Sequence, residues 1–144
     1  MHKKLLLLFV FCLSVCVGGS AKDGTPHIVK RLNLYNQTGS IGPITLYTPK
    51  HAGVFRVNMV TVITVGNGKG GYFDGILGFT DRLGTAGTVL CCGLSSMEPS
   101  LPGNAMSGSA PVPDEIGKPL TLSVVAGGDT QGAQYNVYVV VEEL

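Results

Sequence analysis

Hydrophobic and polar residues alternate along residues 54–65, which is the clearest pattern in the chain. The apolar phase runs from Phe55 to Val65 at every second position, and Thr61 is its one polar member. Successive side chains of a strand point to opposite faces, so this spacing predicts a β-strand with one face on a core. The opposite phase mixes valines with polar residues such as Arg56.

Shorter apolar runs recur along the rest of the chain, and no window shows a convincing helical period. The runs that indicate strands lie at residues 28–35, 44–48, 72–80, 88–94, 120–126 and 135–141. The 21 glycines and eight prolines are spread through the chain, which favours many short strands joined by tight turns. We therefore predict an all-β fold, an antiparallel β-sandwich of the jelly-roll kind.

Residues 95–118 are rich in proline, glycine and serine and are the least strand-like part of the chain. Proline removes a backbone donor, so a central strand is not expected here. We predict a long surface loop that contains at most one short edge strand near residues 105–110.

Residues 66–71 match G-x-G-x-x-G and include Lys69, the pattern of a dinucleotide-binding loop. Such a loop needs a helix after it, whereas the following residues are aromatic residues and glycines that form helices poorly. We predict a β-hairpin connection instead, with Asn67 and Gly68 in the turn and Lys69 at its tip.

The first 21 residues have the pattern of a secretory signal peptide. Lys3 and Lys4 precede an apolar run at residues 5–17, and Gly19, Ser20 and Ala21 supply small residues for cleavage. The run is shorter than the roughly 20 residues that span a bilayer as a helix. We expect residues 22–144 to form a single domain that is secreted or periplasmic. An uncleaved anchor and a lipid on Cys16 are the alternatives.

Charge excludes two classes of partner for the mature chain. Without Lys3 and Lys4 it has eight basic and nine acidic residues, so its net charge is near −1. Nucleic-acid binding needs several clustered Lys or Arg side chains, which this chain lacks. We expect no nucleic-acid partner and, after cleavage, no membrane partner.

Cys91 and Cys92 are the cysteines that remain after cleavage. Two neighbouring cysteines alone cannot form a zinc cage or a disulfide framework. They are candidates for a strained vicinal disulfide or for cross-links between chains. If they stay reduced on a strand, one points inward and the other outward.

Candidate catalytic and metal-binding residues are few. His27 and His51 both fall in segments that indicate surface loops, and we expect no cofactor and no enzymatic activity. A hydrolase or lyase on a jelly-roll scaffold remains an alternative, and it would need His51, Asp81 and Arg82 to converge. Calcium would need Asp74, Asp81 and Asp129 together, although no Asp-x-Asp spacing supports such a site.

Two pairs of adjacent acids, at residues 114–115 and 142–143, are the only neighbouring carboxylates. On an extended chain their side chains point to opposite sides, so neither pair forms a glycosidase centre. Asn36 begins an N-x-T sequon, a candidate N-glycosylation site if the source is a eukaryote.

The stretch YTPKHAGVFRVNMVTVIT, residues 47–64, resembles part of complement-type and tumour-necrosis-factor-like jelly rolls, where proline and glycine precede a long inner strand that begins with an aromatic residue. The ending AQYNVYVVVEEL, residues 133–144, is similar to their closing strand. Small secreted bacterial and phage-associated proteins share such features. The resemblance implies a sandwich of about ten strands that assembles as a trimer and binds ligands between or on top of its subunits.

We predict a secreted, non-enzymatic binding or structural module that forms a homo-oligomer, with a trimer as one form. Val54, Val60 and Val62 lie opposite the core phase of their strand, so they are candidates for an interface. The ligand would be a protein or a glycan. A subunit of a virion or a surface appendage is the alternative.

Overall fold

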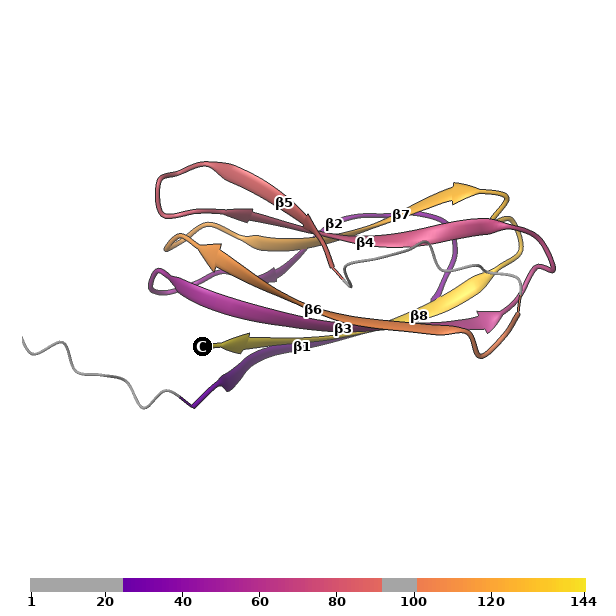
Figure 1. Cartoon of the computed structure of the whole chain (residues 1–144), viewed down its shortest axis with the longest axis horizontal. Helices are drawn as coiled ribbons and strands as arrows, with labels where there is room; N and C mark the ends of the chain where they lie inside the picture. Colours follow the sequence, from indigo (N-terminus) through magenta and orange to yellow (C-terminus); the bar gives the residue numbers. More distant parts are fainter. Residues whose placement is uncertain (1–24, 92–100) are drawn as a thin grey trace, which may run out of the picture.

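The computed structural model describes residues 25–91 and 101–144, which form eight β-strands and no helix (Figure 1). The strands are β1 (His27–Gln37), β2 (Ile41–Tyr47), β3 (Gly53–Val65), β4 (Gly71–Thr80), β5 (Ala86–Leu90), β6 (Ala105–Asp114), β7 (Leu120–Gly128) and β8 (Gln134–Glu143). The all-β prediction is confirmed. The described residues form eight strands, fewer than the ten that the resemblance implied.

The strands form two four-stranded antiparallel sheets that pack face to face (Figure 1). The first sheet has the order β1-β8-β3-β6, and the second has the order β2-β7-β4-β5. Strands far apart in the chain are neighbours, as two interleaved Greek keys require. The predicted antiparallel jelly-roll sandwich is therefore confirmed.

The connection at residues 66–70 is not a β-hairpin, so that prediction was wrong. β3 belongs to the first sheet and β4 to the second, and the connection crosses from one layer to the other. No helix follows it, as expected, because β4 begins at Gly71. Asn67 Oδ1 accepts the Lys69 amide, and Lys69 Nζ lies 3.0 Å from Asp129 Oδ2 in the β7–β8 turn. The glycine-rich loop closes this end of the sandwich.

The core lies between the sheets and is formed by the inward phase of each strand. Phe73 of β4 and Tyr135 of β8 contact each other across the two layers, with ring centroids 4.3 Å apart and the rings tilted by 35°. Gly75 makes room for a side chain of the opposite sheet, because a Cβ there would lie 2.2 Å from Met59 Cε. Burial raises the pKa of Tyr135 to about 12, and its hydroxyl donates to the Gly39 carbonyl at 2.7 Å. Thr61 is buried in the apolar phase of β3, as expected.

β6 corrects the prediction of a long surface loop at residues 95–118. It is a ten-residue strand that pairs with β3 from Gly53↔Asp114 to Val62↔Ala105. The predicted edge position is confirmed, because β6 lies at the border of the first sheet. Pro111 and Pro113 are both exposed, and Val112 between them is buried. The prolines are tolerated because the outer side of an edge strand needs no partner for its backbone donors.

Several predictions concern residues outside the described ranges: the signal peptide at residues 1–21, the lipid site at Cys16, and Cys92. None of the described residues belongs to a helix that could span a bilayer.

Candidate functional site

The outer face of the first sheet, the side turned away from the second sheet, carries most of the exposed apolar side chains that lie on strands. Val60 of β3 pairs with Tyr138 of β8, and Tyr138 meets Tyr35 of β1 edge-to-face with ring centroids 6.0 Å apart. We call Tyr35, Val60, Val62, Tyr138 and Val140 the valine–tyrosine patch. Tyr35 is 55% exposed and Val60 is 39% exposed.

A hydrogen bond positions Tyr138 of this patch, and Tyr35 packs edge-to-face against its ring. Asn136 of β8 accepts the Asn36 amide on Oδ1 at 2.9 Å and offers Nδ2 to the Tyr138 hydroxyl at 3.1 Å. The amide side chain therefore joins the end of β1 to the outer face of β8. A patch whose rings are already positioned loses less side-chain entropy when a partner covers it.

A charged cluster borders the patch on the same face. Arg56 Nε donates to Glu142 Oε2 at 2.7 Å, and Asn58 Nδ2 donates to the same oxygen at 3.0 Å. The hydrogen bonds from Arg56 and Asn58 hold the pKa of Glu142 below its ordinary value, and the nearby Arg31 charge acts in the same direction. The negative charge of Glu142 is therefore balanced by the positive charge of Arg56 on the same face.

The structure separates the three predicted interface residues into two places. Val60 and Val62 belong to the valine–tyrosine patch, whereas Val54 lies beyond Arg56 and Asn58, opposite Pro113 of β6. Sequence reasoning missed Tyr35, Tyr138 and Val140. The alternation in residues 135–141 places Tyr138 on the outer face, but the β3–β8 and β1–β8 pairings that bring the patch together are not visible in any local pattern.

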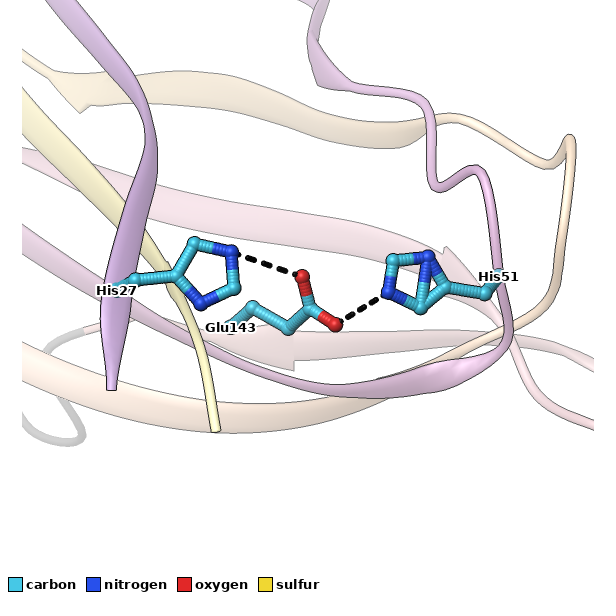
Figure 2. Close-up of polar contacts among 3 residues, drawn as sticks. All are labelled: His27, His51 and Glu143. Carbon is cyan, nitrogen blue, oxygen red and sulfur yellow. Dashed lines mark hydrogen bonds and ion pairs between the residues drawn. The ribbon is translucent and has the colours of Figure 1, made fainter. Parts of the chain in front are cut away.

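A second cluster lies at the end of the sandwich that holds both the start of β1 and the end of β8. Glu143 lies between two histidines from separate elements (Figure 2). Its Oε2 is 3.1 Å from His27 Nε2, and its Oε1 is 2.5 Å from His51 Nε2. The Glu143 side chain is 8% exposed, whereas each imidazole is about half exposed. Glu142 points outward and Glu143 inward, which confirms that this acidic pair diverges.

Asp114 is a second buried acid at this end, at the end of β6. Its Oδ1 accepts the amides of Thr80 and Glu115, while its Oδ2 has no hydrogen-bond partner among the described residues. Burial, the largest effect, raises the pKa of Asp114 above its ordinary value. The two amide bonds oppose this shift, and the Glu115 charge adds to it. Asp114 therefore joins the end of β6 to the end of β4.

The residues considered for a hydrolase or for calcium have separate structural roles. Asp81 caps the β4–β5 turn by accepting the amides of Leu83 and Thr85, and His51 lies against Glu143. Asp129 pairs with Lys69. Within residues 25–91 and 101–144, no group of three or more His, Cys, Asp or Glu side chains could hold a metal ion.

Cys91 and Asn36 lie in different surroundings. Cys91 is buried just after β5, where its amide donates to the Gly75 carbonyl at 2.8 Å. Its neighbour Cys92 lies outside the described residues. Asn36 is exposed near the end of β1 and has a left-handed backbone with φ of 53°. The glycosylation sequon is thus on the surface, and it remains a candidate.

The sequence matches no protein-family model and no curated protein sequence. Solved structures with a similar arrangement include VP2 of an infectious bursal disease virus subviral particle, with 17% identity over 83% of this chain and 33% of that chain, at a TM-score of 0.45. Another is the Gx strain of the same virus, with 12% identity over 82% and 32% of the two chains, at 0.46. A third is the Eiger tumour necrosis factor of S. frugiperda, with 14% identity over 80% and 92%, at 0.42. The chain spans about a third of the viral chains.

Proposed function

We propose that the protein is an exported, non-enzymatic structural module that associates with copies of itself through the outer face of the first sheet. The observation that carries this proposal is the valine–tyrosine patch. Tyr35 and Val60 on this face are exposed and Val62, Tyr138 and Val140 are partly exposed, although the core between the sheets is already closed. Contiguous exposed apolar surface is typical of interaction sites.

Charge favours a second copy of the chain as the occupant. In a symmetric dimer the same face meets itself, so a face with one sign of charge would repel its copy. Here Arg56 and Glu142 neutralise each other, and polar neutral side chains such as Asn33, Asn58 and Ser107 surround the patch. Arg31 also lies beside the patch, opposite Val140, and its charge acts on Glu142. The face can therefore meet its copy without burying unpaired carboxylates.

The test compares two valines with nearly equal exposure on opposite faces. Val60 on β3 is 39% exposed, and Val125 on β7, on the outer face of the second sheet, is 38% exposed. Sedimentation velocity and light scattering across the micromolar range would give the molar mass of the wild type, Val60→Lys and Val125→Lys. We expect an oligomer that Val60→Lys weakens by at least about tenfold, while Val125→Lys leaves it unchanged.

Two results would reject this proposal. One is a wild type that stays monomeric across the micromolar range, and the other is equal weakening by both variants. Circular dichroism of each variant shows whether it is folded, so that a loss of structure is not taken for a loss of association. Electron microscopy of the assembled wild type distinguishes a small closed oligomer from filaments or large particles, which would favour the virion or appendage alternative.

A further inference from the structure

The first half of β6, residues 105–109, is an open edge of the first sheet. β6 pairs with β3 on one side, and no described strand lies on its other side. At the start of β6 the Ile63 amide donates to the Asn104 carbonyl at 2.8 Å, so the backbone of Asn104 faces β3. Successive residues of an antiparallel strand direct their backbone groups to alternate sides. The N–H and C=O groups that face away from β3 therefore belong to Ala105, Ser107 and Ser109.

The prolines in the second half of the strand agree with this assignment. Pro111 and Pro113 are in phase with Ser107 and Ser109, and proline has no N–H to donate. The missing donors therefore lie on the open side, and no bond to β3 is lost. Among the described residues, none forms a hydrogen bond with the backbone on the open side of residues 105–109. The prolines thus block one half of this edge and leave the other half available.

The other three edge strands have features that hinder pairing with another chain. β1 contains Lys30 and Arg31, β2 contains Pro43, and both have register shifts. β5 is only five residues long. Charges, prolines, bulges and short length are the features by which proteins protect sheet edges. Residues 105–109 are uncharged and keep a regular register with β3, so this segment is the unprotected edge of the described chain.

We propose that residues 105–109 pair as antiparallel strands with the same residues of a second copy, which joins the two first sheets edge to edge. A two-fold axis through Ser107 places Ala105 opposite Ser109 of the second copy. These side chains are small and uncharged, so the segment meets its copy without like charges or steric conflict. The three outward residues of each copy exchange about six backbone hydrogen bonds across the axis.

This edge contact is separate from the face contact proposed above. It uses backbone groups of β6, so it does not depend on whether the valine–tyrosine patch is an interface. The two-fold axis is perpendicular to the joined sheet, and the outer faces of both copies therefore lie on the same side. One copy can thus take part in both contacts.

Ser107→Pro tests the backbone contact directly. The new proline is in phase with Pro111 and Pro113, so it removes an outward donor and retains the bonds to β3. Ser107→Ala is the matched control, because it removes the hydroxyl and keeps the N–H. Sedimentation velocity from about 1 μM to about 500 μM compares both changes in the wild type and in Val60→Lys, which weakens the face contact.

We expect the Val60→Lys protein to retain a dimer. Ser107→Pro should raise the dissociation constant of this dimer by at least about tenfold, whereas Ser107→Ala should leave it unchanged. Circular dichroism shows whether each variant is folded. Ser109→Pro removes the neighbouring outward donor and should weaken the dimer in the same way, so it provides the result if Ser107→Pro does not fold.

Hydrogen exchange of the Val60→Lys protein locates the contact. The Ser107 and Ser109 amides should be at least about tenfold more protected at 500 μM than at 1 μM, because only the second copy covers them. Thr88 is the control. Cys91 donates its amide to Gly75 of β4, so alternation places the Thr88 N–H on the open side of β5. Its protection should not change with concentration.

The outcomes separate this inference from the proposed function. If Ser107→Pro weakens association and Val60→Lys does not, the edge contact is supported and the face contact is rejected. If the Val60→Lys protein is monomeric at about 500 μM, the edge contact does not exist. Equal behaviour of Ser107→Pro and Ser107→Ala, or equal responses of Ser107 and Thr88 to concentration, would reject it as well.

Discussion

Asp114 lies fully buried at the end of β6, and its Oδ2 has no hydrogen-bond partner within the described residues. Burial raises the pKa of its carboxyl above 3.8, so the folded state binds this proton more tightly than the unfolded state does. By linkage, the free energy of unfolding falls as the pH rises from 3.8 through the raised pKa, and then levels off. Asp114→Asn removes the ionisation but retains an oxygen for the amides of Thr80 and Glu115. We expect the variant to gain stability relative to the wild type as the pH rises.

Urea unfolding at a series of pH values measures this difference. Asp74→Asn on β4, an acid-to-amide change on the outer face of the second sheet, is the matched control. The difference between this variant and the wild type shows how much an acid-to-amide change alone contributes at each pH. The opposite contribution of Glu142, whose lowered pKa adds stability that is lost in acid, is present in every variant and cancels in the comparison. Parallel curves for Asp114→Asn and the wild type would contradict the prediction.

The sequence predicts which way an acidic side chain points but not how deeply it is buried. Alternation alone places Glu142 and Glu143 on opposite faces, and the structure confirms it. Buried Glu143 contacts His27 and His51, which reach it from β1 and from the β2–β3 loop. Contacts among three distant segments leave no local signal, so the histidines were predicted only as surface residues.

At the scale of elements, β6 is an exposed edge strand whose prolines have a physical role. An edge strand presents unpaired backbone groups that can pair with another chain, and proline removes donors from that edge. Pro111 and Pro113 are both exposed. We expect Pro111→Ser/Pro113→Ser to increase irreversible aggregation, measured as light scattering during incubation at equal protein concentrations. The reason is that two new N–H groups become available on this strand.

Pro119→Ser, outside the strands in the β6–β7 loop, is the control and should aggregate no faster than the wild type. The aggregates should differ from the proposed functional assembly, because adding Val60→Lys should not suppress them. If the double proline variant stays as clear as the control, the prolines do not protect this edge.

The residues of a turn do not determine whether it joins strands of one sheet or of two, and residues 66–70 are an example. Asn67 and Gly68 do form a tight connection, and Gly68 has the positive φ of 66° that such a turn requires. An Asn-Gly turn can connect two strands of one sheet or two strands in different layers, because both connections need only a short reversal of the chain. The choice depends on which strands β3 and β4 pair with, and these partners lie elsewhere in the chain. β6 was underestimated for a similar reason, since its pairing with β3 outweighs the low strand propensity of its prolines.

For the whole molecule, the period-two pattern was enough to predict two stacked antiparallel sheets. It did not predict the order β1-β8-β3-β6, which decides where the valine–tyrosine patch forms. Val60 and Val62 could be identified because they belong to one strand. Tyr35 and Tyr138 complete the patch only after β8 has come to lie between β1 and β3.

That central position of β8 should also govern folding. Its pairing with β1 joins His27 to Glu143, close to the two ends of the described chain, and such non-local contacts slow the search for the native topology. The β4–β5 pair is a local hairpin at the border of the second sheet, so it can form without β8. We expect the transition state for folding to contain β8 paired with β3, and β5 to dock later.

Val137→Ala in β8 and Val89→Ala in β5 test this order. Val137 is fully buried, so its truncation should cost about 2 kcal/mol of stability, and half-buried Val89 should cost about 1 kcal/mol. Stopped-flow refolding and unfolding in urea show how much of each loss of stability comes from slower refolding and how much from faster unfolding. Val137→Ala should mainly slow refolding, whereas Val89→Ala should mainly speed unfolding. If instead Val89→Ala mainly slows refolding and Val137→Ala mainly speeds unfolding, the β4–β5 hairpin forms first and the sandwich assembles around its second sheet.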